Sequence, residues 1–356
     1  MKTISSPLVG LSVSHQSSRK VPSARKHRCH ACAAAILVSF FVAPSVCNAA
    51  SHTIAFPRFE LVISESRTAQ LFHIVDQLSG WDQYTHKQYV RWAAKSSPLN
   101  DEDKRFLQQH VELRHRYGWG SALEKAFLVD EPLDTATRDA VQHGLLTRAE
   151  AAEERDILKH FAARLAPLMQ QQKPVMDRFI RQLNQDHARL APTITELLSF
   201  CEIRHNISVP VFLVANPNDK NGGGEANAGR LVLELPSPDP RSFLLHEALH
   251  LILASHHDEI EAAAKASGLP FESVNEAIAY AFAPGLTEDG TGDDLLADEV
   301  VRMELRATKP TDPYLQFYSM ALVIRPLLRQ ALRKHESFSK FLPKAIQKWK
   351  KTVPHG

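Results

Sequence analysis

Apolar residues recur at helical spacing through most of the chain between residues 67 and 201. In segments 67–79, 83–95 and 101–117 they return every three to four positions, which is the period of an amphipathic helix. Gly118 stands where glycine commonly ends a helix. The pattern therefore predicts three helices over these segments.

A longer helix is predicted to begin at residue 147. Thr147 and Glu150 fit a capping box, in which two side chains close the first turn of a helix. Proline lacks the N–H group that a helix interior needs, so this helix is predicted to end or kink at Pro167. Further helices are predicted near 174–190 and 193–203.

Short β-rich runs replace the helical pattern in the next part of the chain. Residues 207–214 and 230–235 are aliphatic, and each run is short enough to be a strand. Residues 216–229, rich in glycine and asparagine, are predicted to form a loop between them. A further strand is predicted within 53–63, at a sheet edge because Pro57 cannot donate to a neighbouring strand.

An apolar run from Phe243 to Ala254 is predicted to form a buried helix. Asp239 and Pro240 precede it as the N-cap and the first helical residue. Two histidines and a glutamate interrupt the apolar run. Such groups are costly to bury unless they are paired or bind a metal.

These three residues form the pattern H-E-x-x-H. Residues four apart lie on one helix face, so His246 and His250 can occupy two corners of a tetrahedral Zn2+ site. Glu247, beside the first histidine, is placed to accept a proton from water as a general base. The alternative is a core helix whose histidines hydrogen bond to neighbouring groups.

A catalytic zinc site needs a third protein ligand, and Glu276 is the predicted one. It follows His250 by 26 residues, within a run of alanine and apolar residues that predicts another helix. Glu272, one turn earlier, is the nearest rival. Ser273 and Glu276 also fit a capping box, but Pro270 already provides a helix start.

Between residues 207 and 282 the chain resembles the gluzincin group of zinc metallopeptidases, which includes the thermolysin-like enzymes. The resemblance rests on the H-E-x-x-H motif and the Asn275-Glu276 pair. It implies that the two motif histidines and Glu276 bind zinc, and that Glu247 is the general base.

One position departs from the gluzincin pattern. Thermolysin-like enzymes have an acidic residue one turn after the glutamate ligand, and this chain has Tyr280 there. The residue that stabilises the oxyanion is therefore unassigned. Tyr314 and Tyr318 are candidates, and the alternative is that both are core aromatic residues.

A metzincin-like site with His256 as the third ligand is a second interpretation of the same helix. The spacing of His256 from the motif fits that group, but Leu253 occupies the position where metzincins have glycine. A left-handed leucine costs about 1–2 kcal/mol. If the helix simply continued, His256 would lie about 80° away from the face of His246.

The first fifty residues differ from the rest of the chain. They hold six Lys and Arg and no acidic residue, and an apolar run over 31–46 precedes small residues. This order is typical of a secretory signal peptide, with cleavage near Ala49 or Ala50. The alternative is an uncleaved membrane anchor, although the run is shorter than the roughly 20 residues that span a bilayer.

Charge and cysteine content exclude several classes of protein. The chain carries 42 basic and 40 acidic residues, so removing the leader changes its net charge from +2 to −4 and suggests no nucleic-acid partner. Cys29 and Cys32 belong to the leader, and Cys201 is predicted to be a buried, inert thiol. The glycines at 222–224 lack the Lys of a phosphate-binding loop.

The end of the chain is predicted to be mainly helical. The acidic segment 285–294 lacks a complete calcium-loop pattern and is predicted to be a surface turn. Pro326 and Pro343 are expected to kink or interrupt two of the last helices. The predicted helices after the motif are 257–266, 270–282, 294–306, 312–333 and 336–350.

The sequence thus predicts an α+β, mostly helical protein. Its parts are a signal peptide (1–50), a helical N-terminal region (51–203) and a zincin-like metallopeptidase domain (204–356) with a small β-sheet beside the H-E-x-x-H helix. The expected function is zinc-dependent cleavage of peptides or proteins in the periplasm or outside the cell. Membrane association is expected only if the leader is uncleaved. The alternative is a non-catalytic binding protein with a zincin fold.

Overall fold

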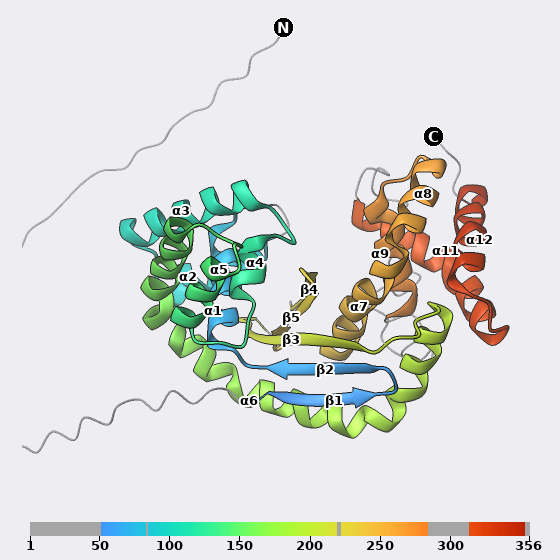
Figure 1. The fold of residues 1–356 in the computed structure, drawn as a ribbon, viewed down its shortest axis with the longest axis horizontal. Helices are drawn as coiled ribbons and strands as arrows, with labels where there is room; N and C mark the ends of the chain where they lie inside the picture. The colour runs from blue at the N-terminus through green and yellow to red at the C-terminus, as the bar shows by residue number, and fades with distance from the viewer. Residues whose placement is uncertain (1–50, 83–84, 219–221, 284–312, 353–356) are drawn as a thin grey trace, which may run out of the picture. The chain divides into compact units, whose positions relative to one another are not determined.

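The computed structural model describes residues 51–82, 85–218, 222–283 and 313–352, which belong to one compact unit (Figure 1). The predicted boundary between residues 203 and 204 lies inside this unit. The predicted signal peptide, the acidic turn at 285–294 and the helix at 294–306 lie outside the described residues.

A five-stranded mixed sheet forms the centre of the fold, with the strand order β1-β2-β3-β5-β4 (Figure 1). The outer pairs β1–β2 and β4–β5 are antiparallel, whereas β2–β3 and β3–β5 are parallel. The strands are β1 (His52–Phe56), β2 (Phe59–Ser64), β3 (Ile207–Ala215), β4 (Gly224–Asn227) and β5 (Arg230–Leu235).

Helices make up most of the described chain. They are α1 (Arg67–Ser79), α2 (Lys87–Ser96), α3 (Asp101–Tyr117), α4 (Ala122–Phe127), α5 (Leu133–Gln142), α6 (Arg148–Phe200), α7 (Pro240–Leu253), the short 3-10 helix η1 (Ala254–His256), α8 (His257–Ser267), α9 (Phe271–Phe282), α11 (Pro313–Arg333) and α12 (Phe338–Thr352). The predicted class, α+β and mostly helical with a small sheet, is therefore confirmed. Within the described ranges, no helix is both long enough and apolar enough to cross a bilayer.

Two predictions about the strands are wrong. The segment 53–63 forms a hairpin of two strands, and Pro57 lies in its turn, where no ladder hydrogen bond is needed. Its first strand, β1, lies at the edge of the sheet as predicted, whereas its second strand, β2, lies inside the sheet. The predicted loop 216–229 contains β4, which is only four residues long and begins with glycine. Pairing with β5 stabilises this strand, so its own sequence does not identify it.

The prediction that proline divides residues 147–203 into several helices is also wrong. α6 runs unbroken for 53 residues with Pro167, Pro174 and Pro192 inside it, after the predicted capping box of Thr147 and Glu150. A proline in a helix interior costs about 3 kcal/mol. α6 offsets this cost because one apolar face packs against α1, α3, α5, β1 and β3 along its length (Figure 1). A fully buried large apolar side chain contributes about 1.5–3 kcal/mol.

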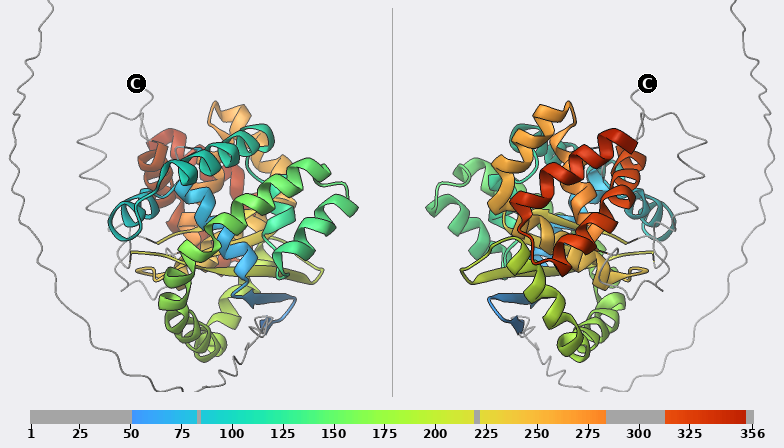
Figure 2. Two further views of the ribbon diagram at one scale, coloured as in Figure 1. Left: turned by 90° about the vertical axis from the view of Figure 1, so that its left-hand side faces the viewer. Right: turned by 90° about the vertical axis from the view of Figure 1, so that its right-hand side faces the viewer.

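The last two helices form a packed pair at the end of the chain. Figure 2 shows α11 and α12 side by side, and α11 also packs against α9 while α12 packs against α8. Both helices continue through their prolines, Pro326 and Pro343. Cys201, at the end of α6, is a buried free thiol whose pKa is raised by burial, as expected for an inert cysteine.

The two faces of the sheet carry different helices near its β4 edge. Side chains alternate between faces along a strand, so Glu225 of β4 and Glu234 of β5 share one face. His73 of α1 contacts both carboxylates, which places α1 on this face. Gly224 points to the opposite face, where α7 packs against β4 and β5. The edge strand therefore lies between α1 and α7.

A buried ionic network joins four of the N-terminal helices. His110 of α3 donates from one ring nitrogen to Asp76 of α1 (3.0 Å) and from the other to Glu154 of α6 (3.0 Å). Arg114 pairs with Asp76 (2.9 Å) and with Glu124 of α4 (2.7 Å). Both His110 nitrogens act as donors, so the ring is an imidazolium cation.

This network makes stability depend on pH. Burial alone would lower the pKa of His110, but the charge of Glu154 and the hydrogen bonds to both carboxylates raise it to about 9. A folded-state pKa above the ordinary value gives stability that is complete below about pH 6.5 and is lost as pH rises through about 9. We expect this group to account for a fall of about 3 kcal/mol in the free energy of unfolding between those values.

Urea titrations at a series of pH values would measure this fall. In the His110→Gln variant the titrating group is absent, so its free energy of unfolding is expected to decrease less over the same pH range. If the free energy of unfolding falls equally with pH in the two proteins, the pH dependence does not come from His110.

Candidate metal centre

The helix α7 carries the H-E-x-x-H motif in a buried position between the sheet and α9. Its N-terminus is capped as predicted, because the carboxylate of Asp239 accepts a hydrogen bond from the backbone N–H of Ser242 (3.2 Å). The side chains of His246 and Glu247 are almost completely buried. The motif therefore lies mostly inside the protein, whereas the Glu276 side chain beside it is 29% exposed.

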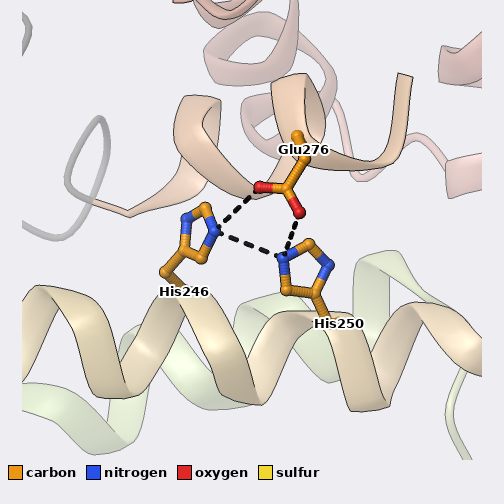
Figure 3. Close-up of side chains that lie close together, drawn as sticks. All are labelled: His246, His250 and Glu276. Carbon is orange, nitrogen blue, oxygen red and sulfur yellow. Dashed lines mark hydrogen bonds and ion pairs between the residues drawn. The ribbon is translucent and has the colours of Figure 1, made fainter. Parts of the chain in front are cut away.

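Three side chains from two helices meet at one point (Figure 3). The Nε2 atoms of His246 and His250 are 3.2 Å apart. The carboxylate of Glu276 on α9 lies 3.3 Å from Nε2 of His246 through one oxygen, and 3.3 Å from Nε2 of His250 through the other. The structure thus brings together the three residues that the sequence predicts as zinc ligands.

The spacing of these atoms is close to that of the ligands around a tetrahedral zinc ion. Ligand atoms at 2.0–2.1 Å from zinc in a tetrahedron lie about 3.3 Å from one another. The two imidazole nitrogens are 3.2 Å apart, and each lies 3.3 Å from a different oxygen of Glu276. One ligand atom from each of the three residues lies within 4.8 Å of the other two. Two imidazoles and one carboxylate are also a ligand set that zinc commonly takes in catalytic sites. The residues present therefore fit this metal.

The outer ring nitrogens of both histidines have partners that orient the rings. Nδ1 of His246 donates to the backbone carbonyl of Ala283 (3.4 Å), which turns Nε2 toward Glu276 and His250. Nδ1 of His250 lies 2.9 Å from the side-chain amide of Asn275. Because Asn275 and Glu276 are consecutive on α9, one turn of this helix supplies both the carboxylate and the group that orients His250.

The charges in the cluster keep the carboxylate ionised. Burial alone would raise the pKa of Glu276, but hydrogen bonds and charges from His246 and His250 hold this pKa far below its usual range. Burial alone would lower the pKa of His250, but the hydrogen bond and charge of Glu276 raise it to about 9. Glu276 is therefore a carboxylate at neutral pH, which is the form that binds a cation.

Glu247 lies beside this cluster and faces the edge strand of the sheet. Burial raises the pKa of its carboxyl group, and the nearby charges of His246 and His250 oppose that change. A Cβ atom placed on Gly224 would be only 2.8 Å from Cγ of Glu247. The side chain therefore packs directly on the backbone of β4.

Tyr280 packs against the cluster as well. Its ring centroid is 4.3 Å from that of His246, and Tyr318 of α11 packs edge-on to Tyr280 at 4.8 Å. Tyr280 follows Glu276 by four residues, so both share one face of α9, and this spacing could have indicated its place from the sequence. The side chain of Tyr314, the other predicted candidate, lies outside the described residues.

The structure does not bring His256 to the motif histidines. α7 ends at Leu253 and passes into a 3-10 turn with right-handed backbone angles, not the left-handed turn of metzincins. His256 donates from Nε2 to the carbonyl of Cys201 (2.9 Å), and its other nitrogen contacts Glu259 (3.1 Å). Glu272, the rival to Glu276, is exposed. The metzincin-like alternative is therefore not supported.

A second polar cluster lies on the other face of the edge strands, and sequence analysis did not find it. Glu234 of β5 is fully buried and contacts Nε2 of His73 (2.9 Å) and Nδ1 of His86 (2.9 Å). Glu225 of β4 contacts the other nitrogen of His73 (3.1 Å). The indication in the sequence was Glu234 itself, a charged residue within the apolar strand 230–235.

Opposite charges stabilise this second cluster. Burial alone would lower the pKa of His73, but the charges and hydrogen bonds of Glu225 and Glu234 raise it to about 10. Burial alone would raise the pKa of Glu234, but His86 and His73 lower it to about 2. The cluster is therefore a buried arrangement of cations and anions, with its two histidines coming from the N-terminal part of the chain.

Comparisons with known proteins add no family assignment. A scan against models of protein families found no match, and searches among curated proteins and solved structures found no similar chain. The resemblance to gluzincins therefore rests on the motif residues alone.

Proposed function

We propose that this chain is an exported zinc metallopeptidase of the gluzincin type with a zincin-like fold. The observation that carries the proposal is the convergence of His246, His250 and Glu276, whose ligand atoms lie within 4.8 Å of one another and form a set that zinc commonly takes. Glu247 lies next to this cluster in a buried position. Together these groups provide three metal ligands and a base, which are the parts that metal-assisted hydrolysis needs.

The residues have separate chemical tasks. A bound zinc ion supplies a Lewis acid that lowers the pKa of a water molecule and polarises the scissile carbonyl. Glu247 accepts the proton of this water as its oxygen bonds to the carbonyl carbon. As the carbon–nitrogen bond breaks, Glu247 passes the proton to the leaving amine nitrogen. The carboxylate therefore ends the reaction in the state in which it began.

The edge strand β4 offers a place for an extended peptide beside Glu247. The N–H of Glu234 donates to the carbonyl of Gly223 (2.9 Å), so hydrogen bonds to β5 fall at alternate residues of β4. The N–H and C=O groups of Gly224 and Ala226 therefore point away from β5, to the side where β4 has no partner among the described residues. A peptide that pairs with these groups extends the sheet by one strand and passes next to the base.

Zinc content and peptide cleavage test this proposal together. We expect one zinc ion per chain and cleavage of an unstructured protein substrate. A chelator is expected to abolish cleavage, and added zinc is expected to restore it, because the ligand set leaves a position for water. Mass spectrometry of the metal-bound protein and of the cleavage products would measure both. Stoichiometric zinc without cleavage of any substrate would instead favour the non-catalytic binding protein.

A further inference from the structure

Two consecutive glycines at the start of β4 are in tight contact with side chains on opposite faces of the sheet. A Cβ atom on Gly224 would lie 2.8 Å from Cγ of Glu247 and 3.2 Å from the carbonyl oxygen of Val232. A Cβ atom on Gly223 would lie 2.7 Å from Cε1 of His86. Carbon atoms in contact are normally separated by about 3.5–4.0 Å, so neither position has room for a methyl group.

The imidazole of His86 is fixed on its side of the strand. Its Nδ1 lies 2.9 Å from both oxygens of Glu234, so the ring donates to a carboxylate that is itself fully buried. The backbone N–H of His86 donates to the side chain of Gln77 in α1 (2.6 Å). His86 is thus attached to β5 and to α1, and it can act as a rigid support for Gly223.

β4 needs such a support because, among the described strands, it pairs only with β5. An edge strand of four residues can move away from the sheet more easily than a strand with two neighbours. Glu247 packs on this strand, so movement of β4 changes the position of the carboxylate relative to a peptide paired with Gly224. A displacement of about 1 Å in a catalytic arrangement can cost about a hundredfold in rate.

We propose that His86 is a positioning residue for Glu247: its ring, held by Glu234, presses on Gly223 and keeps Gly224 against the catalytic carboxylate. The proposal deepens the peptidase function and rests on it where catalysis is concerned. It also gives a reason for the glycine run 222–224 that is unrelated to phosphate binding. Close packing on both faces of the strand excludes every side chain at Gly223 and Gly224.

A double-mutant cycle tests the packing without any assay of activity. Gly223→Ala is expected to lower the folding equilibrium constant of the otherwise wild-type chain by about tenfold or more, because the methyl group overpacks against the ring of His86. In the His86→Ala background the same substitution is expected to be neutral or stabilising, because alanine is favoured over glycine in a strand. Urea unfolding of the four proteins measures this coupling.

An equal cost of Gly223→Ala in both backgrounds would overturn the inference. Gly223→Ala alone could fail to fold. In that case, folding of the double variant Gly223→Ala/His86→Ala supports the coupling. If the double variant also fails to fold while His86→Ala folds, the inference is overturned. His86 is 37% exposed, so its replacement by alanine removes no large part of the core.

Kinetics of the full chain test the positioning role. His86→Ala is expected to lower kcat by about tenfold to a hundredfold, with KM and zinc affinity within about twofold of wild type. His86→Asn keeps a donor for Glu234 but has no ring, so its kcat is expected to stay low. Recovery of kcat in His86→Asn would overturn the role of the ring. His143→Ala, at an exposed histidine after α5, is the control and is expected to keep wild-type kcat.

The outcomes separate this inference from the proposed function. If the double-mutant cycle shows coupling but His86→Ala has the kcat of wild type, the positioning role is overturned and the peptidase function is unaffected. If the cycle shows coupling but the wild-type chain cleaves no peptide, the peptidase function is overturned. The role of His86 in positioning a catalytic base is then overturned as well.

Discussion

Replacing Glu247 by glutamine is expected to lower kcat by more than about a thousandfold while the protein still binds one zinc ion. The amide has nearly the same size as the carboxylate, so it fits the contact with Gly224, but it cannot accept a proton from water. General acid–base catalysis contributes about 10²–10⁴ in rate. Glu247 acts both on the water and on the leaving amine, so the expected loss in kcat lies toward the upper end of this range.

The measurement is kcat on an unstructured substrate, combined with zinc analysis of the same sample. Glu102→Gln is a suitable control, because Glu102 lies exposed on α3 and the change in charge is the same. Retention of wild-type turnover by Glu247→Gln would show that another group is the base. Loss of zinc from this variant would show that Glu247 helps to bind the metal.

Replacing Glu276 by glutamine is expected to weaken zinc binding by more than about a hundredfold and to remove activity as a result. Changes to groups that only orient metal ligands already cost 10–100-fold in affinity, and Glu276 is predicted to bind the ion directly. The substitution also removes the negative charge that the two histidines face. Competition with a chromogenic chelator would measure the affinity.

Glu272→Gln provides a matched control for this second prediction. Glu272 lies one turn earlier on the same helix and is exposed. Its replacement by glutamine makes the same change in size and charge as the replacement of Glu276. We expect this variant to keep the zinc affinity and activity of the wild-type protein. Equal zinc affinity in the two variants would remove Glu276 from the proposed ligand set and leave the hydrolytic mechanism without a third ligand.

The parts of the fold that the sequence predicts are those set by local interactions. α1 and α3 have the predicted bounds because capping residues and terminal glycines act within one turn of the helix end. The course of α6 through Pro167 could not be predicted in this way. Whether a helix continues past a proline depends on the apolar surface that the next turns bury against distant elements.

The same difference between local and distant interactions decides which residues of the candidate site could be predicted. The spacing of His246 and His250 is local, so the sequence alone places them on one face of a helix. Glu276 could be predicted from the sequence because a charged residue within an apolar helix needs a partner. The contact of His86 with Glu234 joins residues 148 positions apart, and no local pattern links a loop histidine to a strand that distant in sequence.

The parallel pairing of β2 with β3 affects how the chain is made. Phe59 of β2 aligns with Ile207 of β3, so 148 residues must be synthesised after Phe59 before its partner exists. At about 5–20 residues per second, translation of this interval takes about 7–30 s. Throughout that time one edge of β2 remains open to other chains, and contacts between such distant segments form slowly. The parallel edge of β2 can therefore be covered by its own chain only after residues 207–212 have been synthesised.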